Sequence, residues 1–376
     1  MNPTVPVLDS DPIPGPTPRP PRLAAVDLAR GLAVLFMIAV HILLVHGDTA
    51  LQSSFVGKII QFLGGPPAAP IFMLLMGLSF AYAGKNEPGV TVRRGLIVLA
   101  SGYLLNFLRG VLPLLVLGWF APAATEGILP VGVGLTDLFL IGDILQFAGL
   151  ALVAMALIHR MRAGSGAILI IATVVAGIAP FLWGLRSGFA PLDLVLDLLW
   201  GDRLLPPPME NAISFPVFPW LAFPLVGMVL GERLRNAADP RSDIRRAGLI
   251  GLALLAVGLG ISFTDPEWHF NDYYHARWGS MIFMVGFVLV WLAACDLVAR
   301  GMPENPAFRF LAFCSKQVTA IYFLQWILIN WAIAILGENR LGPAAAFGMF
   351  LVVTLASYAG AACSLALRRS RHPVSP

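Results

Sequence analysis

Long apolar segments recur along the whole chain, separated by short polar breaks. A helix needs about 20 consecutive apolar residues to cross a hydrocarbon core of about 30 Å. Hydrophobic residues make up 58% of the chain and charged residues 12%, against about 25% charged residues in soluble domains. We therefore predict an all-α, polytopic membrane helix bundle of about ten transmembrane helices. The expected segments are 31–46, 66–84, 95–121, 136–158, 166–185, 213–231, 247–263, 278–298, 310–336 and 343–367.

The polar breaks divide by charge. With an inside N-terminus, ten helices place the breaks that are rich in Arg and Lys in the cytoplasm, as the positive-inside rule requires. We expect both termini to be cytoplasmic and the protein to be integral to a membrane, the bacterial inner (plasma) membrane. The opposite breaks, such as 264–277, carry most of the acidic, His and Tyr side chains. The basic breaks are the N-terminal arm with Arg19 and Arg22, 85–94, 159–162, 233–246, 300–309 and 368–371.

The two ends of the chain differ from its apolar body. Residues 1–22 are rich in Pro and lack the apolar core of a signal peptide, so we expect a disordered cytoplasmic arm. Residues 23–370 form a single predicted transmembrane domain, and 371–376 form a tail. The three cysteines lack the close spacing of metal sites, and no metal is expected. The net charge of +4 comes mainly from Arg in the breaks, so no nucleic-acid partner is expected.

The first span carries two ionisable residues, Arg30 and His41, separated by ten apolar residues. Eleven helical steps place them about 16 Å apart and on nearly the same face. Ionisable groups inside a span are candidates for function by default. The alternatives stay open: Arg30 as an interfacial anchor paired with Asp27, and His41 as a packing residue. His46, near the outer boundary of the span, competes with His41 for a catalytic role.

Gly and Pro interrupt two spans, at Gly64 to Pro70 before the second and at Pro216, Pro219 and Pro224 around the sixth. A broken helix at membrane depth requires protein or a water-filled cavity to satisfy its free backbone groups. We therefore expect an internal cavity near these two segments.

Five motifs in sequence order resemble those of one family. Their pattern is similar to the catalytic domain of the heparan-alpha-glucosaminide N-acetyltransferase group, within the acyltransferase 3 type of membrane acyltransferases. Members that have a luminal domain place the catalytic His in the first outer loop, where this chain has Gln52, and Lys316 stands where small polar residues are usual. The motifs run from Asp27 to His41, Pro70 to Gly77, Ile144 to Gln146, Phe218 to Trp220 with Gly227 and Gly231, and Ile321 to Trp326.

The resemblance implies transfer of an acyl group, most simply acetyl, from cytosolic acetyl-CoA to a hydroxyl or amine of a sugar-like or lipid-linked acceptor at the extracytoplasmic face. Arg pairs well with phosphate, so Arg30, Arg93, Arg94 and Lys85 are the candidates for binding CoA. His41 is the candidate general base, with His46 as the alternative.

The resemblance does not decide which residue orients the histidine or which one donates to the oxyanion. Asp143 or Asp137 could orient the histidine, with Asp143 preferred because it lies inside the apolar run. Gln146 or Asn211 is the candidate oxyanion donor. Direct transfer and an acyl-histidine intermediate stay equally open.

A transporter or flippase of a polar lipid or glycan is the leading alternative, because a kinked bundle with a buried Arg and His would also serve transport. Transporters often contain internal repeats, and the sequence has no convincing repeat. Membrane lipid, acyl-CoA and a glycan or small-molecule acceptor are the expected partners. A homodimer is possible by analogy with the class.

Overall fold

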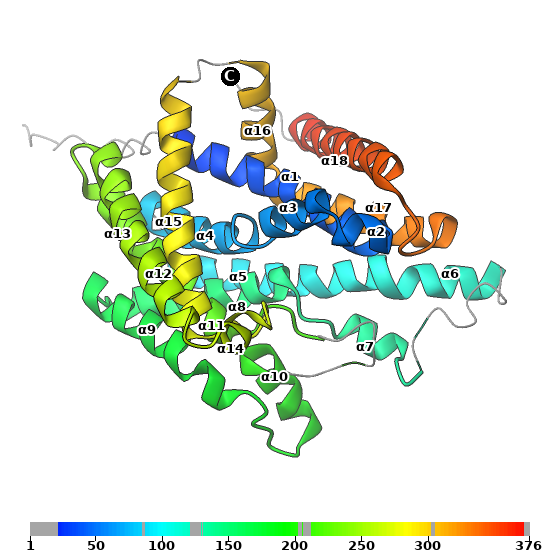
Figure 1. Ribbon diagram of the computed structural model, residues 1–376, viewed down its shortest axis with the longest axis horizontal. Coiled ribbons are helices and arrows are strands. Elements are labelled where there is room, and N and C mark those ends of the chain that lie inside the picture. The colour runs from blue at the N-terminus through cyan, green and yellow to red at the C-terminus, as the bar shows by residue number, and fades with distance from the viewer. Residues whose placement is uncertain are drawn as a thin grey trace, which may run out of the picture.

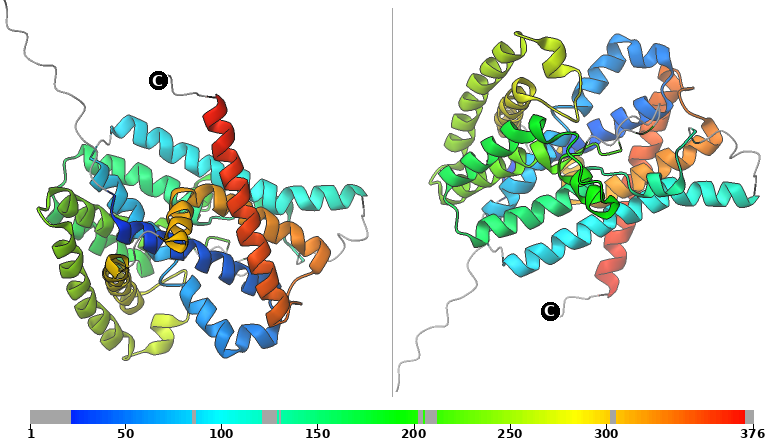
Figure 2. Two further views of the ribbon diagram at one scale, coloured as in Figure 1. Left: turned by 90° about the horizontal axis from the view of Figure 1, so that it is seen from above. Right: turned by 90° about the horizontal axis from the view of Figure 1, so that it is seen from below.

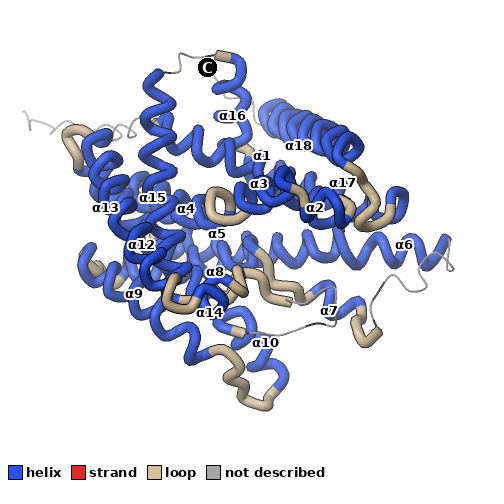
Figure 3. The backbone as a smooth tube through the Cα atoms, in the orientation of Figure 1, coloured by secondary structure: helices blue, strands red, loops and turns tan. Residues whose placement is uncertain are grey.

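Helices form nearly all of the regular structure in the computed structural model, which describes residues 22–84, 87–120, 129, 131–201, 205, 212–301 and 305–371 (Figures 1 and 3). No strand is assigned within these ranges, only two isolated bridges. The first nine elements are α1 (Ala24–His46), α2 (Thr49–Ser53), α3 (Phe55–Gly64), α4 (Ala69–Ala83), α5 (Pro88–Asn106), the π-helical turn η1 (Phe107–Val111), α6 (Leu112–Phe120), α7 (Leu135–Phe139) and α8 (Ile144–Arg160). The others are α9 (Ser165–Leu182), α10 (Ala190–Trp200), α11 (Val217–Trp220), α12 (Ala222–Asn236), α13 (Pro240–Ser262), α14 (Pro266–Phe270), α15 (Trp278–Gly301), α16 (Pro306–Lys316), α17 (Val318–Leu336) and α18 (Pro343–Arg371).

The all-helical membrane fold predicted from the sequence is confirmed. Nine helical stretches among the described residues are long and apolar enough to cross a membrane. The remaining expected segment, 136–158, overlaps α8, an apolar helix of 17 residues that ends at Arg160. The expected segment 310–336 is divided, because α16 ends at Lys316 and α17 begins at Val318.

Helix α1 lies in the middle of the bundle and contacts α3, α4, α15, α16, α17 and α18 (Figure 1). Helices α13 and α15 pack along each other on one side. Helix α18 lies obliquely across the opposite side (Figure 2). A central α1 brings its polar residues against several other helices, while the peripheral helices leave large apolar side chains exposed, as a lipid-facing surface does.

Helices α4 and α12 pack at very short distance, because glycines face backbone across their interface. A Cβ at Gly77 would overlap the carbonyl of Pro224, and Gly227 and Gly231 lie against Leu74 and Leu78 in the same way. Small residues at this spacing allow membrane helices to approach closely. No space for a cavity is left where these glycines meet the facing backbone. A cavity does border α12, the sixth expected span, on its side toward α9, α13 and α15.

Candidate active site

His41 lies in the second half of α1 and is half-buried. Its imidazole stacks on the indole of Trp326 from α17, with ring centroids 4.1 Å apart and planes inclined by 30°. Its Nδ1 is enclosed and has no hydrogen-bond partner among the described residues. The ring is therefore held by packing and keeps hydrogen-bonding capacity for a ligand.

Asp143 is the N-cap of α8 and collects donors from three elements. Its carboxylate forms an ion pair with Arg109 at 3.2 Å. It also accepts hydrogen bonds from the Tyr322 hydroxyl at 2.8 Å and from the backbone N–H of Ile144 at 2.7 Å. The Asp143 and Arg109 side chains are only 15% and 10% exposed, so the pair lies largely out of solvent, where its geometry is strongly held.

Trp326 contacts both His41 and the Arg109 side chain that pairs with Asp143. The guanidinium carbon of Arg109 lies 4.4 Å from the centre of the indole, within the range of a cation–π contact. The same indole stacks on His41. His41, Trp326, Arg109, Asp143 and Tyr322 therefore form one continuous set of contacts, called here the His41 cluster.

The position of Arg109 follows from a local irregularity of the long helix α5–α6. Pro113 has no N–H to give to the carbonyl four residues earlier, which belongs to Arg109, and its ring would clash with that carbonyl. The helix widens into η1 before it, where the N–H of Leu112 bonds to the carbonyl of Phe107 five residues back. The Trp331 indole donates to the carbonyl of Leu108 at 2.9 Å. Such π-helical turns are frequent at functional sites.

The loop before Asp143 is fixed from both sides. The Asn106 amide donates to the carbonyls of Phe139 and Ile141 at 3.0 and 2.7 Å. Gly142 exchanges backbone hydrogen bonds with Ala212 and Ser214, both of 2.8 Å. Asp143 therefore enters the bundle at a defined place.

Two buried amides near the His41 cluster also lack partners among the described residues. Gln146 has an unpartnered Nε2, and Gln325 has both amide atoms unpartnered. A Cβ at Gly102 of α5 would lie 2.7 Å from the Gln146 side chain, so this glycine makes room for the amide. Unpartnered polar atoms at this depth are costly in a protein alone. Both amides therefore keep the capacity to form a hydrogen bond with a polar ligand.

The predicted CoA ligands lie at one end of the bundle. Arg30 donates from Nη2 to the Ser79 hydroxyl at 2.7 Å and to the Leu75 carbonyl at 3.3 Å, both on α4. Arg93 and Arg94 are exposed on the first turns of α5, which follows α4 directly. Lys85, in the connection between these helices, lies outside the described residues.

Asp27 does not make the predicted pair with Arg30. Its carboxylate pairs with Arg22 at 3.1 Å and accepts a hydrogen bond from Ser315 at 2.8 Å. The Arg30 guanidinium turns instead to α4, where its Nη2 makes both of the hydrogen bonds found for this side chain among the described residues.

The other predicted candidates have local structural contacts. His46 is buried, and its two ring nitrogens each lie 2.9 Å from a carbonyl oxygen, of Gly337 and of Ile329. Asp137 accepts the backbone N–H of Gly134 at the start of α7. Asn211, the alternative oxyanion donor, lies outside the described residues.

The loop between α14 and α15 brings Tyr274 close enough to Asp143 for the two groups to interact electrostatically. The Trp220 indole donates to the Tyr274 carbonyl at 2.7 Å. Burial, and then the negative charge of Asp143, raises the pKa of Tyr274 to about 12. Tyr274 therefore stays neutral beside the carboxylate at physiological pH.

Sequence reasoning missed Arg109 and gave no chemical role to Tyr322 or Trp326. The sequence feature that singled out Arg30 was also present at Arg109, which is a charged residue inside the apolar segment 95–121. Nothing in the sequence alone joins Tyr322 to Asp143, since the two are 179 residues apart.

The fold and this cluster define an integral membrane protein with a buried polar site between several of its helices. The family model for the catalytic domain of heparan-alpha-glucosaminide N-acetyltransferase matches residues 22–260, well over half of the chain. The chain belongs to this family, and the resemblance drawn from its motifs is confirmed. Membership implies a membrane acetyltransferase that uses acetyl-CoA. A comparison with curated proteins gives no match.

Proposed function

We propose that the protein transfers an acetyl group from cytosolic acetyl-CoA to an amine or hydroxyl of a sugar-like or lipid-linked acceptor at the extracytoplasmic face, with His41 as the general base. The observation that carries this proposal is the imidazole of His41. It lies inside an apolar span, is fixed against Trp326, and has an Nδ1 for which the described part of the chain supplies no hydrogen-bond partner. Histidine suits proton transfer near neutral pH.

In direct transfer, the acceptor nitrogen or oxygen attacks the carbonyl carbon of the thioester, and His41 takes the proton that the acceptor loses. The carbon–sulfur bond then breaks, and the CoA thiolate leaves and recovers a proton from the imidazolium. An acyl-histidine intermediate would use the same residue as nucleophile. Low water content around the His41 cluster would protect the thioester from hydrolysis.

The other members of the His41 cluster have positioning roles in this proposal. The Arg109–Asp143 pair fixes the Tyr322 hydroxyl, and Trp326 fixes the plane of the imidazole. Gln146 is the proposed donor to the oxyanion of the tetrahedral intermediate, because its buried Nε2 has no other partner among the described residues.

Three observations support the proposed placement of the donor and acceptor. Arg30, Arg93 and Arg94 lie toward the end of the bundle at which α4 is joined to α5. The breaks on that side are basic, which favours a cytoplasmic location for this end and for both termini. The carboxyl-terminal part of α1, with His41, points to the opposite face, where we place the acceptor.

The first test is calorimetric titration of the purified full-length protein with acetyl-CoA. We expect saturable binding that is about tenfold weaker in Arg30→Ala, as for loss of one charged hydrogen-bonding partner. His41→Ala and the control Arg160→Ala, which removes an exposed arginine of another break, should bind like the wild type. Absence of binding by the folded wild type would contradict the proposal and favour the transporter alternative.

The second test is transfer of labelled acetyl from acetyl-CoA to glucosamine, the amine that the family name suggests. The wild type should form N-acetylated product, and His41→Ala should not. Binding of acetyl-CoA without transfer to glucosamine would retain the donor assignment and exclude this acceptor.

A further inference from the structure

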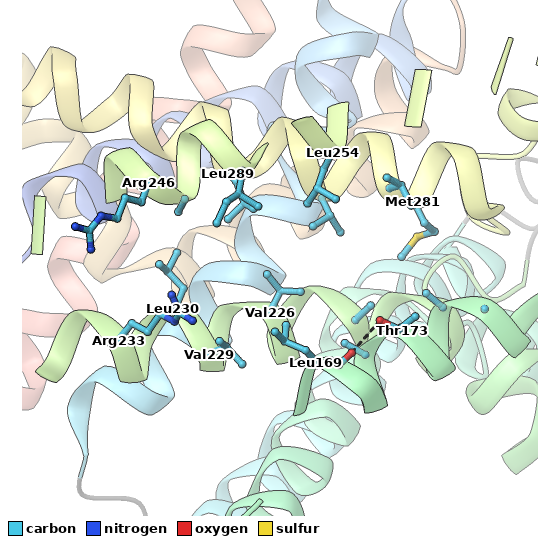
Figure 4. Close-up of a pocket in the computed structure, with 18 of the residues that line it drawn as sticks. Leu169, Thr173, Val226, Val229, Leu230, Arg233, Arg246, Leu254, Met281 and Leu289 are labelled. Carbon is cyan, nitrogen blue, oxygen red and sulfur yellow. Dashed lines mark hydrogen bonds between the residues drawn. The ribbon is translucent and has the colours of Figure 1, made fainter. Parts of the chain in front are cut away.

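A large apolar groove lies away from the His41 cluster, with a volume of about 740 Å³. Its walls come from α9, α12, α13 and α15. Figure 4 shows Leu254, Leu289 and Met281 on one wall, facing Val226 and Leu169 on the other. Apart from a few groups near its ends, the lining consists of aliphatic side chains.

The groove lies at membrane depth. All four helices belong to the stretches that are long and apolar enough to cross a membrane. On α15 the lining runs from Trp278 to Leu289, a rise of about 16 Å along the helix axis. This length is about half of a hydrocarbon core of about 30 Å, so the groove matches the depth of one leaflet or more. A lipid chain suits it, because water gains no hydrogen bonds from such walls.

One end of the groove carries positive charge. Arg233, from the last turns of α12, and Arg246, from the first turns of α13, line this end together with Asp243. Figure 4 places both arginines at the same end of the groove. Arg246 pairs with Asp243 at 3.4 Å, and no carboxylate among the described residues forms an ion pair with Arg233. The end therefore has an excess positive charge next to an apolar channel.

We propose that this groove binds one membrane phospholipid with an anionic headgroup. The phosphate lies at Arg233 and Arg246, and an acyl chain extends along α13 and α15 toward Trp278. Arginine pairs well with phosphate, and basic pockets between membrane helices bind anionic headgroups. None of the lining residues belongs to the His41 cluster, so the site is independent of the proposed acetyl transfer.

Gly177 of α9 gives a way to fill the groove without disturbing the fold. It lines the groove, and a Cβ at this position would meet no atom within 4 Å. Gly166 of the same helix has equally open space and does not line the groove. Gly177→Leu and Gly166→Leu therefore form a matched pair that adds the same side chain to the same helix.

The experiment is native mass spectrometry of the full-length protein in detergent, titrated with phosphatidylglycerol or with phosphatidylcholine of the same acyl chains. The wild type should retain one phosphatidylglycerol at least tenfold more tightly than phosphatidylcholine. Gly177→Leu should lose this lipid, and Gly166→Leu should retain it. Replacing Arg233 and Arg246 together by Gln should remove the preference for phosphatidylglycerol, with Arg160→Gln plus Arg368→Gln as the control of equal charge.

Three outcomes would overturn the proposal. The first is equal binding of the two lipids by the wild type. The second is unchanged phosphatidylglycerol binding in the Arg233 and Arg246 double variant, or in Gly177→Leu. The third is displacement of the lipid by glycerol phosphate at similar concentration, because a ligand without acyl chains would then suffice.

Discussion

Two histidines five residues apart on α1 have opposite surroundings. His46 is fully buried, and both ring nitrogens lie within hydrogen-bond distance of carbonyl oxygens near the end of α17. The backbone carbonyl of His46 also accepts hydrogen bonds from Arg340 and Leu341. His41 is half-buried, is stacked on Trp326, and leaves Nδ1 without a partner among the described residues.

The comparison shows that burial of an ionisable group does not by itself indicate chemistry. The hydrogen-bonding capacity of His46 is used within the fold, where it ties the end of α1 to α17. The capacity of His41 is not used up, and a charged and aromatic cluster surrounds it. Unsatisfied capacity at a well-fixed position is what a catalytic or binding group requires.

The largest effect is expected for His41→Gln, which removes the base and keeps a polar side chain. Turnover should fall by about 10²- to 10⁴-fold, the usual contribution of general acid–base catalysis. The melting temperature and acetyl-CoA affinity should change little. Steady-state transfer assays and thermal unfolding in detergent measure both quantities. Unchanged turnover would exclude His41 as the base and return the role to His46.

The second-largest effect, on both stability and turnover, is expected for Asp143→Asn, which leaves Arg109 without its buried counter-charge. Breaking one side of a buried pair costs about 3 kcal/mol or more, so unfolding should occur at lower temperature and turnover should also fall. The double variant Arg109→Gln with Asp143→Asn removes both charges and should regain part of the stability while remaining poorly active. Equal stability of the single and double variants would show that the pair is not coupled.

A smaller effect, on stability, is expected for His46→Ala. The change removes the hydrogen bond that a ring N–H of His46 donates to the carbonyl oxygen of Gly337 or of Ile329, which costs about 1 kcal/mol. Thermal unfolding should show this loss, while turnover per folded molecule should stay within about tenfold of the wild type. A loss of turnover as large as that of His41→Gln, in a protein still folded, would remove the distinction between the two histidines.

The smallest effect concerns Tyr274, in the loop between α14 and α15, and the dependence of stability on pH. The pKa of Tyr274 is about 12 in the fold because of burial and of Asp143, above the value of about 10 for a free tyrosine. The unfolded chain therefore loses this proton first, and stability should fall as the pH rises from 10 to 12. Tyr274→Phe should unfold with a weaker pH dependence in that window, and near pH 7 it should differ from the wild type only by the loss of the hydrogen bond with Ser214, about 1 kcal/mol. An identical alkaline profile for both proteins would contradict the raised pKa.

Most of the fold could be predicted because membrane helices depend on local composition. Segment length and hydropathy located the spans, and nine of them appear in the structure with α8 as the shorter tenth. The division between the arm 1–22, the domain 23–370 and the tail 371–376 stays a prediction, as does the orientation of the termini. A cavity was expected near spans two and six, and one does border α12. Its exact place depends on which faces of the helices meet, as the glycine contacts between α4 and α12 show.

Less of the candidate site could be predicted. Arg30, His41 and Asp143 stand out as ionisable residues in apolar sequence. Arg109 was missed, although the same argument applied to it. The pairing of Asp27 with Arg22 and Ser315, and the different environments of His41 and His46, depend on side-chain orientation and on distant helices.

The sequence by itself determined that this protein is an integral membrane helical bundle. Each span must satisfy its own backbone hydrogen bonds, and it needs about 20 apolar residues to cross the hydrocarbon core. The sequence also determined the family, through motifs carried on single spans. Only the tertiary structure decided which polar residues meet. Asp143 and Tyr322 come together across 179 residues and His46 and Ile329 across 283, and such contacts depend on how helices pack, which no local pattern records.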